Sequence, residues 1–219
     1  MTFDLRGIGL TSQRARNRLA NRLREMGIQS AEVLEVMRMV PRHLFVDEAL
    51  ASRAYENTAL PIGYGQTISQ PYTVARMTEA IIRAGPVDTV LEVGGGSGYQ
   101  AAVLANFARR VYSVERIAVL VTRLRRRLDA LGYRNILVRH GDGSVGWPEY
   151  APYDAILIAA ASAVIPVAAL EQLRVGGRLV MPVGEPGRQQ LLLVTRREEG
   201  FDEEPLEPVS FVPMLEGVA

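Results

Sequence analysis

The turn over residues 91–100 constrains the fold of this chain most, because it joins an apolar stretch to a helical one almost without side chains. Its glycines are spaced G-x-G-x-G, at Gly94, Gly96 and Gly98. Glycine permits positive φ and lets a ligand approach the peptide units, while the N–H groups at a helix start attract electronegative groups. The segment predicts a strand, a cofactor-binding turn and a helix, and a tight connection that binds nothing is the alternative.

Two residues distinguish this turn from a dinucleotide fingerprint. Tyr99 stands where the third glycine of that fingerprint would lie, and Glu92 comes two positions before the first glycine. The pattern departs from NAD and FAD sites and resembles the cofactor loop of class I methyltransferases. The resemblance implies S-adenosyl-L-methionine as the cofactor, held by Glu92 and the three glycines among other residues.

Short β-rich runs alternate with helical patterns along the chain from residue 72. We predict strands over 89–93, 110–114, 135–139, 155–159 and 178–183, and helices over 72–82, 99–107, 117–131 and 166–173. This alternation predicts an α/β fold with a doubly wound, mostly parallel, Rossmann-like sheet and helices on both faces. Two further strands, over 191–195 and 209–214, are expected to form a C-terminal antiparallel hairpin, joined by an exposed acidic turn over 198–207.

The first 54 residues are predicted to form a helical N-terminal extension. Apolar residues recur at helical spacing among arginines up to Gly27, and a second helical pattern ends at Pro41, whose ring removes a donor. Residues 55–71 are rich in glycine and proline and predict an ordered loop. We expect one methyltransferase domain over 1–219, in which the loop 55–71 contacts substrate and cofactor and residues 72–219 form the cofactor-binding core.

The amino-acid composition excludes several kinds of site and partner. The chain has no cysteine and two distant histidines, His43 and His140, which excludes a disulfide scaffold and a thiolate nucleophile and gives no reason to expect a metal site. A net charge of +1 provides no broad field for nucleic acid or an anionic membrane. Residues 1–4 lack the pattern of a signal peptide, and no segment reaches the roughly 20 apolar residues of a membrane span. We therefore expect a cytoplasmic protein, and a monomer.

Acidic residues follow the predicted strands. Glu115 ends the second strand, where a carboxylate commonly accepts both ribose hydroxyls of a cofactor, and Asp142 and Gly143 follow the third, where an acidic turn can accept the adenine amino proton. Singly, Glu115 could instead cap the following helix or pair with Arg116, and Asp142 could form an Asx turn. Because ligands of a doubly wound sheet lie beyond the carboxyl ends of its strands, their joint occurrence favours one cofactor site.

Two other features have simpler interpretations. His140 beside Asp142 suggests a catalytic pair, but a histidine that ends a strand is more often a structural group. The arginines between 123 and 127 could bind phosphate or nucleic acid, but on a surface helix such a run is usually a solvated face.

A donor-rich segment precedes the helix at residue 72. Gln66, Thr67, Ser69 and Gln70 bring two hydroxyls and two amides, and the segment could be no more than a capped helix start. Together with V-P-R at 40–42, S-V-E-R at 113–116, H-G-D-G at 140–143 and F-V-P at 211–213, it closely resembles the protein-L-isoaspartate (D-aspartate) O-methyltransferases, nearly end to end.

That resemblance implies a reaction and a set of site residues. The reaction is methylation, by S-adenosyl-L-methionine, of the free carboxylate of L-isoaspartyl and D-aspartyl residues in damaged proteins, after which the ester collapses to a succinimide and hydrolysis restores some aspartate. Ser69 is implied to be catalytic. The implied cofactor-binding residues are Gln66, Thr67, Ile68, Ser69, Gly94, Glu115, Arg116, Asp142 and Gly143. The chain departs from the family pattern at Gly95 and over 159–161, where a lost hydroxyl could weaken the hold on the cofactor.

The chemistry of a carboxylate acceptor agrees with the donor-rich segment. A carboxylate with a reference pKa of about 4 is ionised at neutral pH, so methyl transfer to it needs no general base, whereas a hydroxyl or amine acceptor would need one. The segment offers no base, and Ser69 is expected to orient the carboxylate as a donor. Three other functions stay open: methylation of a normal aspartate in one dedicated peptide, a non-catalytic S-adenosylmethionine sensor, and a nicotinamide dehydrogenase, which Tyr99 disfavours.

Overall fold

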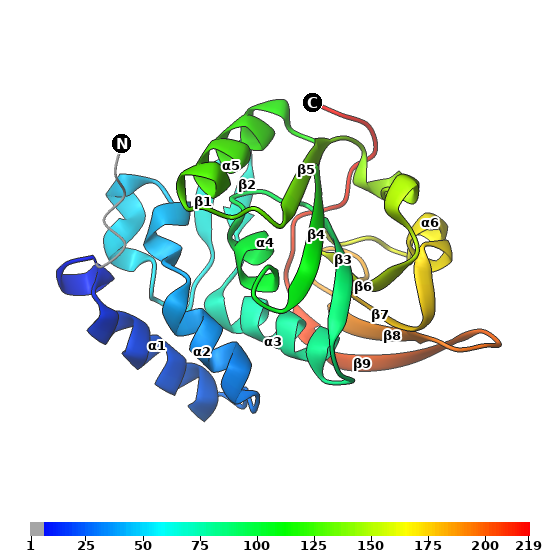
Figure 1. Ribbon diagram of the computed structural model, residues 1–219, viewed down its shortest axis with the longest axis horizontal. Helices are drawn as coiled ribbons and strands as arrows, with labels where there is room; N and C mark the ends of the chain where they lie inside the picture. The colour runs from blue at the N-terminus through cyan, green and yellow to red at the C-terminus, as the bar shows by residue number, and fades with distance from the viewer. Residues whose placement is uncertain (1–6) are drawn as a thin grey trace.

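A seven-stranded sheet forms the centre of the protein. The structure is a computed structural model that describes residues 7–219, so the expectation for residues 1–4 lies outside it. The strand order is β5-β4-β3-β6-β7-β8-β9, parallel from β5 to β7 and antiparallel from β7 to β9 (Figure 1). The strands are β3 (Val87–Val93), β4 (Ala108–Glu115), β5 (Ile136–His140), β6 (Tyr153–Ile158), β7 (Leu173–Val183), β8 (Gln189–Arg196) and β9 (Phe201–Val209). The predicted mostly parallel sheet with a C-terminal antiparallel hairpin is confirmed.

Helices cover both faces of the sheet, as predicted. On one face lie α3 (Pro71–Ile82), α4 (Tyr99–Leu104) and α5 (Ala118–Ala130), and on the other lie α6 (Val167–Glu171) and the 3-10 helices η4 (Gly143–Val145) and η5 (Pro148–Tyr150). Successive residues of a strand point to opposite faces, so Val90 packs in the cluster with Leu104 and Leu91 in the cluster with Trp147. Strands that are buried on both faces are rich in consecutive apolar residues, and this pattern allows the parallel strands to be predicted from the sequence.

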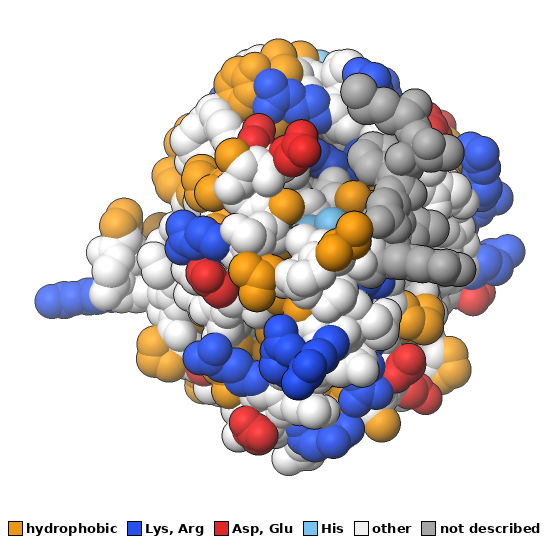
Figure 2. Space-filling view, turned by 90° about the vertical axis from the view of Figure 1, so that its left-hand side faces the viewer, with side chains coloured by type: hydrophobic (Ala, Val, Ile, Leu, Met, Phe, Trp, Pro, Cys, Tyr) orange, Lys and Arg blue, Asp and Glu red, His pale blue; other side chains and the backbone are white. Residues whose placement is uncertain are grey.

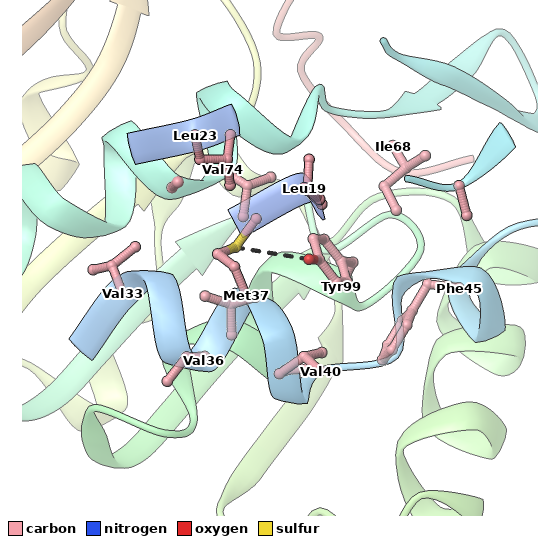
Figure 3. Close-up of a cluster of buried hydrophobic side chains, with 14 of the residues drawn as sticks. Leu19, Leu23, Val33, Val36, Met37, Val40, Phe45, Ile68, Val74 and Tyr99 are labelled. Atoms are coloured by element: carbon pink, nitrogen blue, oxygen red, sulfur yellow. Dashed lines mark hydrogen bonds between the residues drawn. The ribbon is translucent and has the colours of Figure 1, made fainter. Parts of the chain in front are cut away.

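The N-terminal helices share a core with the glycine turn and α4. They are α1 (Gln13–Glu25) and α2 (Ala31–Met39), with the 3-10 helices η1 (Gly9–Thr11), η2 (Arg42–Phe45) and η3 (Glu48–Arg53). Figure 3 shows Tyr99 among side chains of these elements, with its hydroxyl 3.7 Å from Met37 Sδ and its ring edge-on to Phe45. The first residue of α4 is therefore held by the N-terminal extension.

The segment over 55–71 is more regular than predicted. Instead of an irregular loop it contains a hairpin of β1 (Leu60–Gly63) and β2 (Gln66–Ile68). Tyr64 and Gly65, at the turn, have φ of 56° and 69°. Positive φ at both central residues matches the twist of a two-residue hairpin, so a short antiparallel pair forms where composition indicated a loop.

The C-terminal hairpin is confirmed, but the predicted position of its second strand is wrong. β9 occupies residues 201–209, and the expected acidic turn over 198–207 is mostly this strand. The connection is short, closed by the N–H of Arg197 donating to Gly200 O at 3.0 Å. β9 lies at the sheet edge, where a strand pairs with one neighbour only and can therefore contain prolines and acidic residues. These residue types are common in turns, which explains why the sequence predicted a turn here.

The surface over the N-terminal helices carries charges of both signs. In Figure 2, which faces this side, basic side chains lie in separate groups among acidic and apolar ones. Within residues 7–219, no helix is both long enough and apolar enough to cross a membrane.

Candidate functional site

The glycine turn leads from β3 to α4 at the carboxyl edge of the parallel strands, as predicted. Three of its N–H groups already have acceptors in the protein: Gly94 and Gly95 donate to Val114 O at 2.8 and 3.2 Å, and Gly96 donates to Glu115 Oε2 at 2.8 Å. These three N–H groups are therefore not free to bind an electronegative ligand. With these three donors already used, the turn offers fewer N–H groups to a pyrophosphate, which disfavours a dinucleotide.

Gly98 serves helix packing rather than a ligand. It precedes α4 with φ of 87°, and a Cβ at this position would lie 3.2 Å from Leu124 Cγ of α5. Glycine here lets α5 approach the turn from the side away from the cavity described below.

The departure at Gly95 also faces the protein interior. A Cβ on Gly95 would lie 2.5 Å from Ser113 Oγ and 2.9 Å from Leu124 Cδ1. A hydroxyl side chain at this position would start toward the sheet, not toward the cavity. The structure therefore gives no support to the expectation that its loss weakens the hold on a cofactor.

One cavity lies against the turn, the hairpin and the strand ends. It opens to solvent on one side, and residues from all three of these segments form its walls. Its walls are Gln66, Thr67, Ile68, Ser69, Val74, Val93, Gly94, Gly95, Gly96, Ser97, Tyr99, Gln100, Val114, Glu115, Arg116, Ile117, Gly143, Ala159, Ala160, Val212, Pro213, Met214 and Leu215. The structure thus brings the donor-rich segment to the glycine turn and to the residues after β4 and β5. Among the predicted cofactor residues, Glu92, Gly98 and Asp142 are not in these walls.

Glu92 lies beneath the turn. Its side chain is fully buried, Oε2 accepts a hydrogen bond from Ser113 Oγ, and Oε1 has no partner among the described residues. Burial raises the pKa of Glu92 to about 8, and the charge of Glu115 adds to the rise while the Ser113 hydrogen bond opposes it. Glu92 is therefore a support of the turn from inside the sheet.

Glu115 connects the turn to the start of α5. Its Oε2 accepts from Gly96 N and its Oε1 from Ile117 N, both at 2.8 Å, and its side chain is nearly buried. Each carboxylate oxygen can accept two hydrogen bonds, so both oxygens keep a free lone pair beside the cavity. The capping alternative and the ligand-binding interpretation of Glu115 are thus compatible.

Asp142 forms the Asx turn that was its alternative. Its Oδ1 accepts from Ser144 N at 2.8 Å and Ser144 Oγ at 2.7 Å, and its Oδ2 accepts from Gly217 N at 2.6 Å. Partial burial raises the pKa of this carboxyl, but the hydrogen bonds and the nearby Arg116 outweigh burial and hold the pKa below its usual value. Asp142 is thus an anchored anion next to Gly143 at the cavity edge.

The hairpin presents free hydroxyls. The side chains of Thr67 and Ser69 have no hydrogen-bond partner among residues 7–219. Both also line a second hollow, which we call the outer groove. It is lined by Ala59, Thr67, Ser69, Gln70, Tyr72, Thr73, Ala159, Glu207, Pro208, Val209, Ser210, Phe211 and Val212. The two hydroxyls therefore stand where the cavity meets the groove.

The remaining candidates lie away from the cavity walls. His140 places Nε2 3.0 Å from Arg116 O, and His43 places Nδ1 2.8 Å from the Tyr55 hydroxyl. Neither histidine lines the cavity, in agreement with the structural interpretation of His140.

The arginine run on α5 is solvated only in part. Three of its side chains are exposed, but Arg127 is half-buried and donates to Ser97 O at 2.6 Å. Burial lowers the pKa of Arg127. Arg127 therefore stabilises the glycine turn through a hydrogen bond to its backbone.

Sequence reasoning missed the C-terminal contribution. Residues 212–215 line the cavity although they carry no ionisable side chain. The F-V-P run at 211–213 contributed to the family resemblance, but its residue types did not indicate that it lines the cavity.

Comparisons with known proteins were made on the whole chain. The family model described as Protein-L-isoaspartate(D-aspartate) O-methyltransferase matches residues 13–219. The chain is 61% identical over 211 residues to the protein-L-isoaspartate O-methyltransferase of Halorhodospira halophila, covering 96% of each chain. It is 59% identical over 208 residues to that of Ectopseudomonas mendocina, covering 95% of this chain and 99% of that one.

Solved structures agree on the fold. A protein-L-isoaspartate O-methyltransferase superposes with a TM-score of 0.82 at 28% identity, covering 90% of this chain and 65% of that longer chain. A Plasmodium falciparum protein described as a protein-L-isoaspartate O-methyltransferase, solved in complex with S-adenosyl-L-homocysteine, superposes with a TM-score of 0.77 at 24% identity, covering 91% of this chain and 98% of that one.

Proposed function

The chain belongs to the protein-L-isoaspartate(D-aspartate) O-methyltransferase family, and from this premise we propose how its cavity carries out the reaction. The enzyme transfers a methyl group from S-adenosyl-L-methionine to the free carboxylate of isoaspartyl residues in proteins. The role of each residue in this reaction is inferred from the contacts described above.

The cavity walls and the cavity edge fit the cofactor at three places. When bound, S-adenosyl-L-methionine supplies a methyl group on a positively charged sulfur, and it carries no phosphate, which suits a turn in which the N–H groups of residues 94–96 already have acceptors. Glu115 would accept the ribose hydroxyls with its free lone pairs. Asp142 and Gly143 would bind the adenine edge, and Gly94, Gly96 and Arg116 would border the rest.

The free Ser69 hydroxyl is the observation that carries the catalytic assignment. It lines both the cavity and the outer groove, so a carboxylate entering from the groove would meet it on the cofactor side. Gln66, Thr67 and Ile68 would form the rest of this wall. A hydroxyl donor to a charged carboxylate contributes about 1.5–3 kcal/mol, and correct orientation of two reactants contributes up to roughly 7–11 kcal/mol.

The ionisable groups of the cavity walls are not placed to remove a proton. Glu115 accepts two backbone hydrogen bonds and would use its remaining lone pairs on the ribose, Arg116 is a cation, and burial raises the pKa of Tyr99 above its usual value. An ionised carboxylate has no proton to lose, so this set of groups suffices for it. A hydroxyl or amine substrate would lack a proton acceptor among these wall residues.

The test uses labelled S-adenosyl-L-methionine and a pair of peptides that differ only in isoaspartate against aspartate. We expect a base-labile methyl ester on the isoaspartyl peptide alone. Esterification of the aspartyl peptide alone would favour a dedicated normal-aspartate target, and binding without any transfer would favour a sensor. Either result contradicts the proposal.

Ser69→Ala tests the role of the hydroxyl. We expect kcat to fall roughly 10- to 100-fold, the loss of one hydrogen bond to a charged group, while the Kd of S-adenosylhomocysteine changes less than about twofold. Thr122→Ala, which removes an exposed hydroxyl on α5, is the matched control. An equal loss of turnover and cofactor affinity would make Ser69 a cofactor-binding residue instead.

We further propose that residues 1–219 act as one domain, as a monomer in the cytoplasm, on protein substrates and without nucleic acid or membrane. The hydrophobic cluster that joins Leu23 and Met37 to Tyr99 and Leu124 supports a single unit. The mixed charge of the chain supports the absence of a polyanionic partner. Light scattering on the purified protein tests the monomer, and a dimer mass would refute it.

A further inference from the structure

Glu207 places a carboxylate in the outer groove. Of the groove walls that the structure describes, Glu207 is the only residue whose side chain is charged at neutral pH. Its Oε2 accepts a hydrogen bond from the Tyr72 hydroxyl at 3.1 Å, and its side chain is 24% exposed. Its Oε1 has no hydrogen-bond partner among residues 7–219. The groove therefore offers one free carboxylate oxygen to a molecule that enters it.

The ionic groups around Glu207 leave a net negative charge. Arg76 Nε lies 3.5 Å from Glu207 Oε2, and Arg76 Nη1 lies 3.5 Å from Glu79 Oε2. The other oxygen of Glu79 is bound by two backbone N–H groups at the start of α2. One guanidinium is thus shared by two carboxylates, which leaves one negative charge over, and the neighbouring pair of Arg83 and Glu204 adds no net charge.

Tyr72 connects this carboxylate to the segment that carries Ser69. Tyr72 is the second residue of α3 and comes three positions after Ser69, and both line the outer groove. Figure 1 shows the end of β9, where Glu207 lies, beside α3. Three residues of chain span at most about 11 Å between Cα atoms, and an extended peptide needs about three residues for the same length. A substrate side chain about three positions from the isoaspartate can therefore come within reach of Glu207.

We propose that Glu207 is a specificity-determining residue, which favours isoaspartyl sites with a lysine or arginine within about three positions and disfavours those with an acidic residue there. The proposal rests on the entry of the substrate through the outer groove in the proposed function. A partly exposed charge pair contributes little, so the effect is a preference and not a requirement. Glu207 acts on the flanking part of the substrate and not on the reacting carboxylate, so the effect is expected in KM rather than in kcat.

The experiment measures kcat and KM for isoaspartyl peptides that carry lysine, glutamine or glutamate at one flanking position, scanned over the three positions on each side. At the most sensitive position we expect kcat/KM to be about three- to tenfold higher for the lysine peptide than for the glutamate peptide. The glutamine peptide should lie between them. This ratio should shrink as the ionic strength rises from about 0.02 to about 0.5 M, because salt screens the charges.

Two variants should move this ratio in opposite directions. Glu207→Gln removes the charge and keeps an oxygen for the Tyr72 hydroxyl, so the ratio should fall below about twofold, while kcat/KM for the glutamine peptide changes less than about twofold. Arg76→Gln removes the neighbouring cation and should raise the ratio by about twofold. Glu203→Gln is the matched control, because it removes an exposed charge of the same strand outside the groove walls, and it should leave the ratio unchanged.

A ratio near one in the natural chain, a ratio that Glu207→Gln leaves unchanged, or an equal fall in the Glu203→Gln variant overturns the proposal. A merely structural role of Glu207 would lower kcat/KM for all peptides alike. Thermal unfolding of each variant reports folding, and if Glu207→Gln does not fold, the rise expected for Arg76→Gln still tests the proposal. If no isoaspartyl peptide is methylated, the proposed function is wrong. If all are methylated equally whatever their flanking charge, only the role of Glu207 is wrong.

Discussion

Replacing Glu92 with glutamine should remove a pH dependence from the stability of this fold. Burial beneath the glycine turn raises the pKa of Glu92 from 4.5 to about 8. In the unfolded chain the carboxyl ionises near its usual pKa, so the unfolded state loses its proton first as the pH rises. The contribution of this carboxyl to the unfolding free energy is thus greatest below about pH 4.5, where both states are protonated. It decreases as the pH rises above 4.5 and stops decreasing once the pH has passed the folded pKa near 8.

The size of the effect follows from the shift. One pKa unit corresponds to roughly 1.4 kcal/mol, so between about pH 6 and about pH 8 the natural chain should lose about 2 kcal/mol of unfolding free energy through this group. Glutamine has no proton to release and still offers an oxygen to the Ser113 hydroxyl. The stability of Glu92→Gln relative to the natural chain should therefore rise by about 2 kcal/mol over that interval.

Urea unfolding followed by the fluorescence of the single tryptophan, the buried Trp147, measures this difference at both pH values. Glu199→Gln, at an exposed position, is the control and should follow the natural chain. If Glu92→Gln keeps a constant offset from the natural chain at both pH values, the carboxyl is ionised in the fold and the reasoning fails.

Three further changes test the site and its supports. Glu115→Gln should weaken S-adenosylhomocysteine roughly 10- to 100-fold by calorimetry, because a charged acceptor becomes neutral, and an unchanged Kd would remove Glu115 from the cofactor site. Gly143→Ala should lower the unfolding free energy by about 1–3 kcal/mol, because its Cβ would lie 2.3 Å from Val93 Cγ1; Val93→Ala in the same chain should recover part of the loss, and strict additivity would refute this clash. Arg42→Met should lower the unfolding free energy by about 2 kcal/mol, measured by urea unfolding, because Ala54 O and Thr58 O lose the hydrogen bonds that the buried guanidinium donates. An unfolding free energy equal to that of the natural chain would show that neither of these hydrogen bonds stabilises the fold.

The parallel part of the fold could be predicted because its strands are buried on both faces. In the strand that ends at Val93, the apolar residues Val90, Leu91 and Val93 are buried on both faces of the sheet, and helices with one apolar face separate such strands. β9 could not be found in the same way, since an edge strand needs no apolar alternation. The hairpin around Tyr64 was hidden by a turn geometry that composition alone does not specify.

The candidate site was predictable where function needs a side chain with its own chemistry. Ser69 and Glu115 line one cavity as expected, because strand ends and the preceding hairpin meet at one edge of the sheet. Glu92 and Gly98 belong to the same motif but serve the interior of the turn, a distinction that depends on the direction of each Cα–Cβ bond. Leu215 could not be found, because only the course of the folded chain brings it to the cavity.

The composition of β9 has a consequence for how the molecule behaves among its own copies. An outermost strand presents unpaired N–H and C=O groups, which is a template for adding a strand from another molecule. Pro205 and Pro208 carry no N–H, while Asp202 pairs with Arg197 and Glu204 with Arg83. Two such edges would lack the N–H donors that a continuous ladder of hydrogen bonds needs. The strand whose sequence looks least like a strand thus protects this side of the sheet against edge-to-edge aggregation.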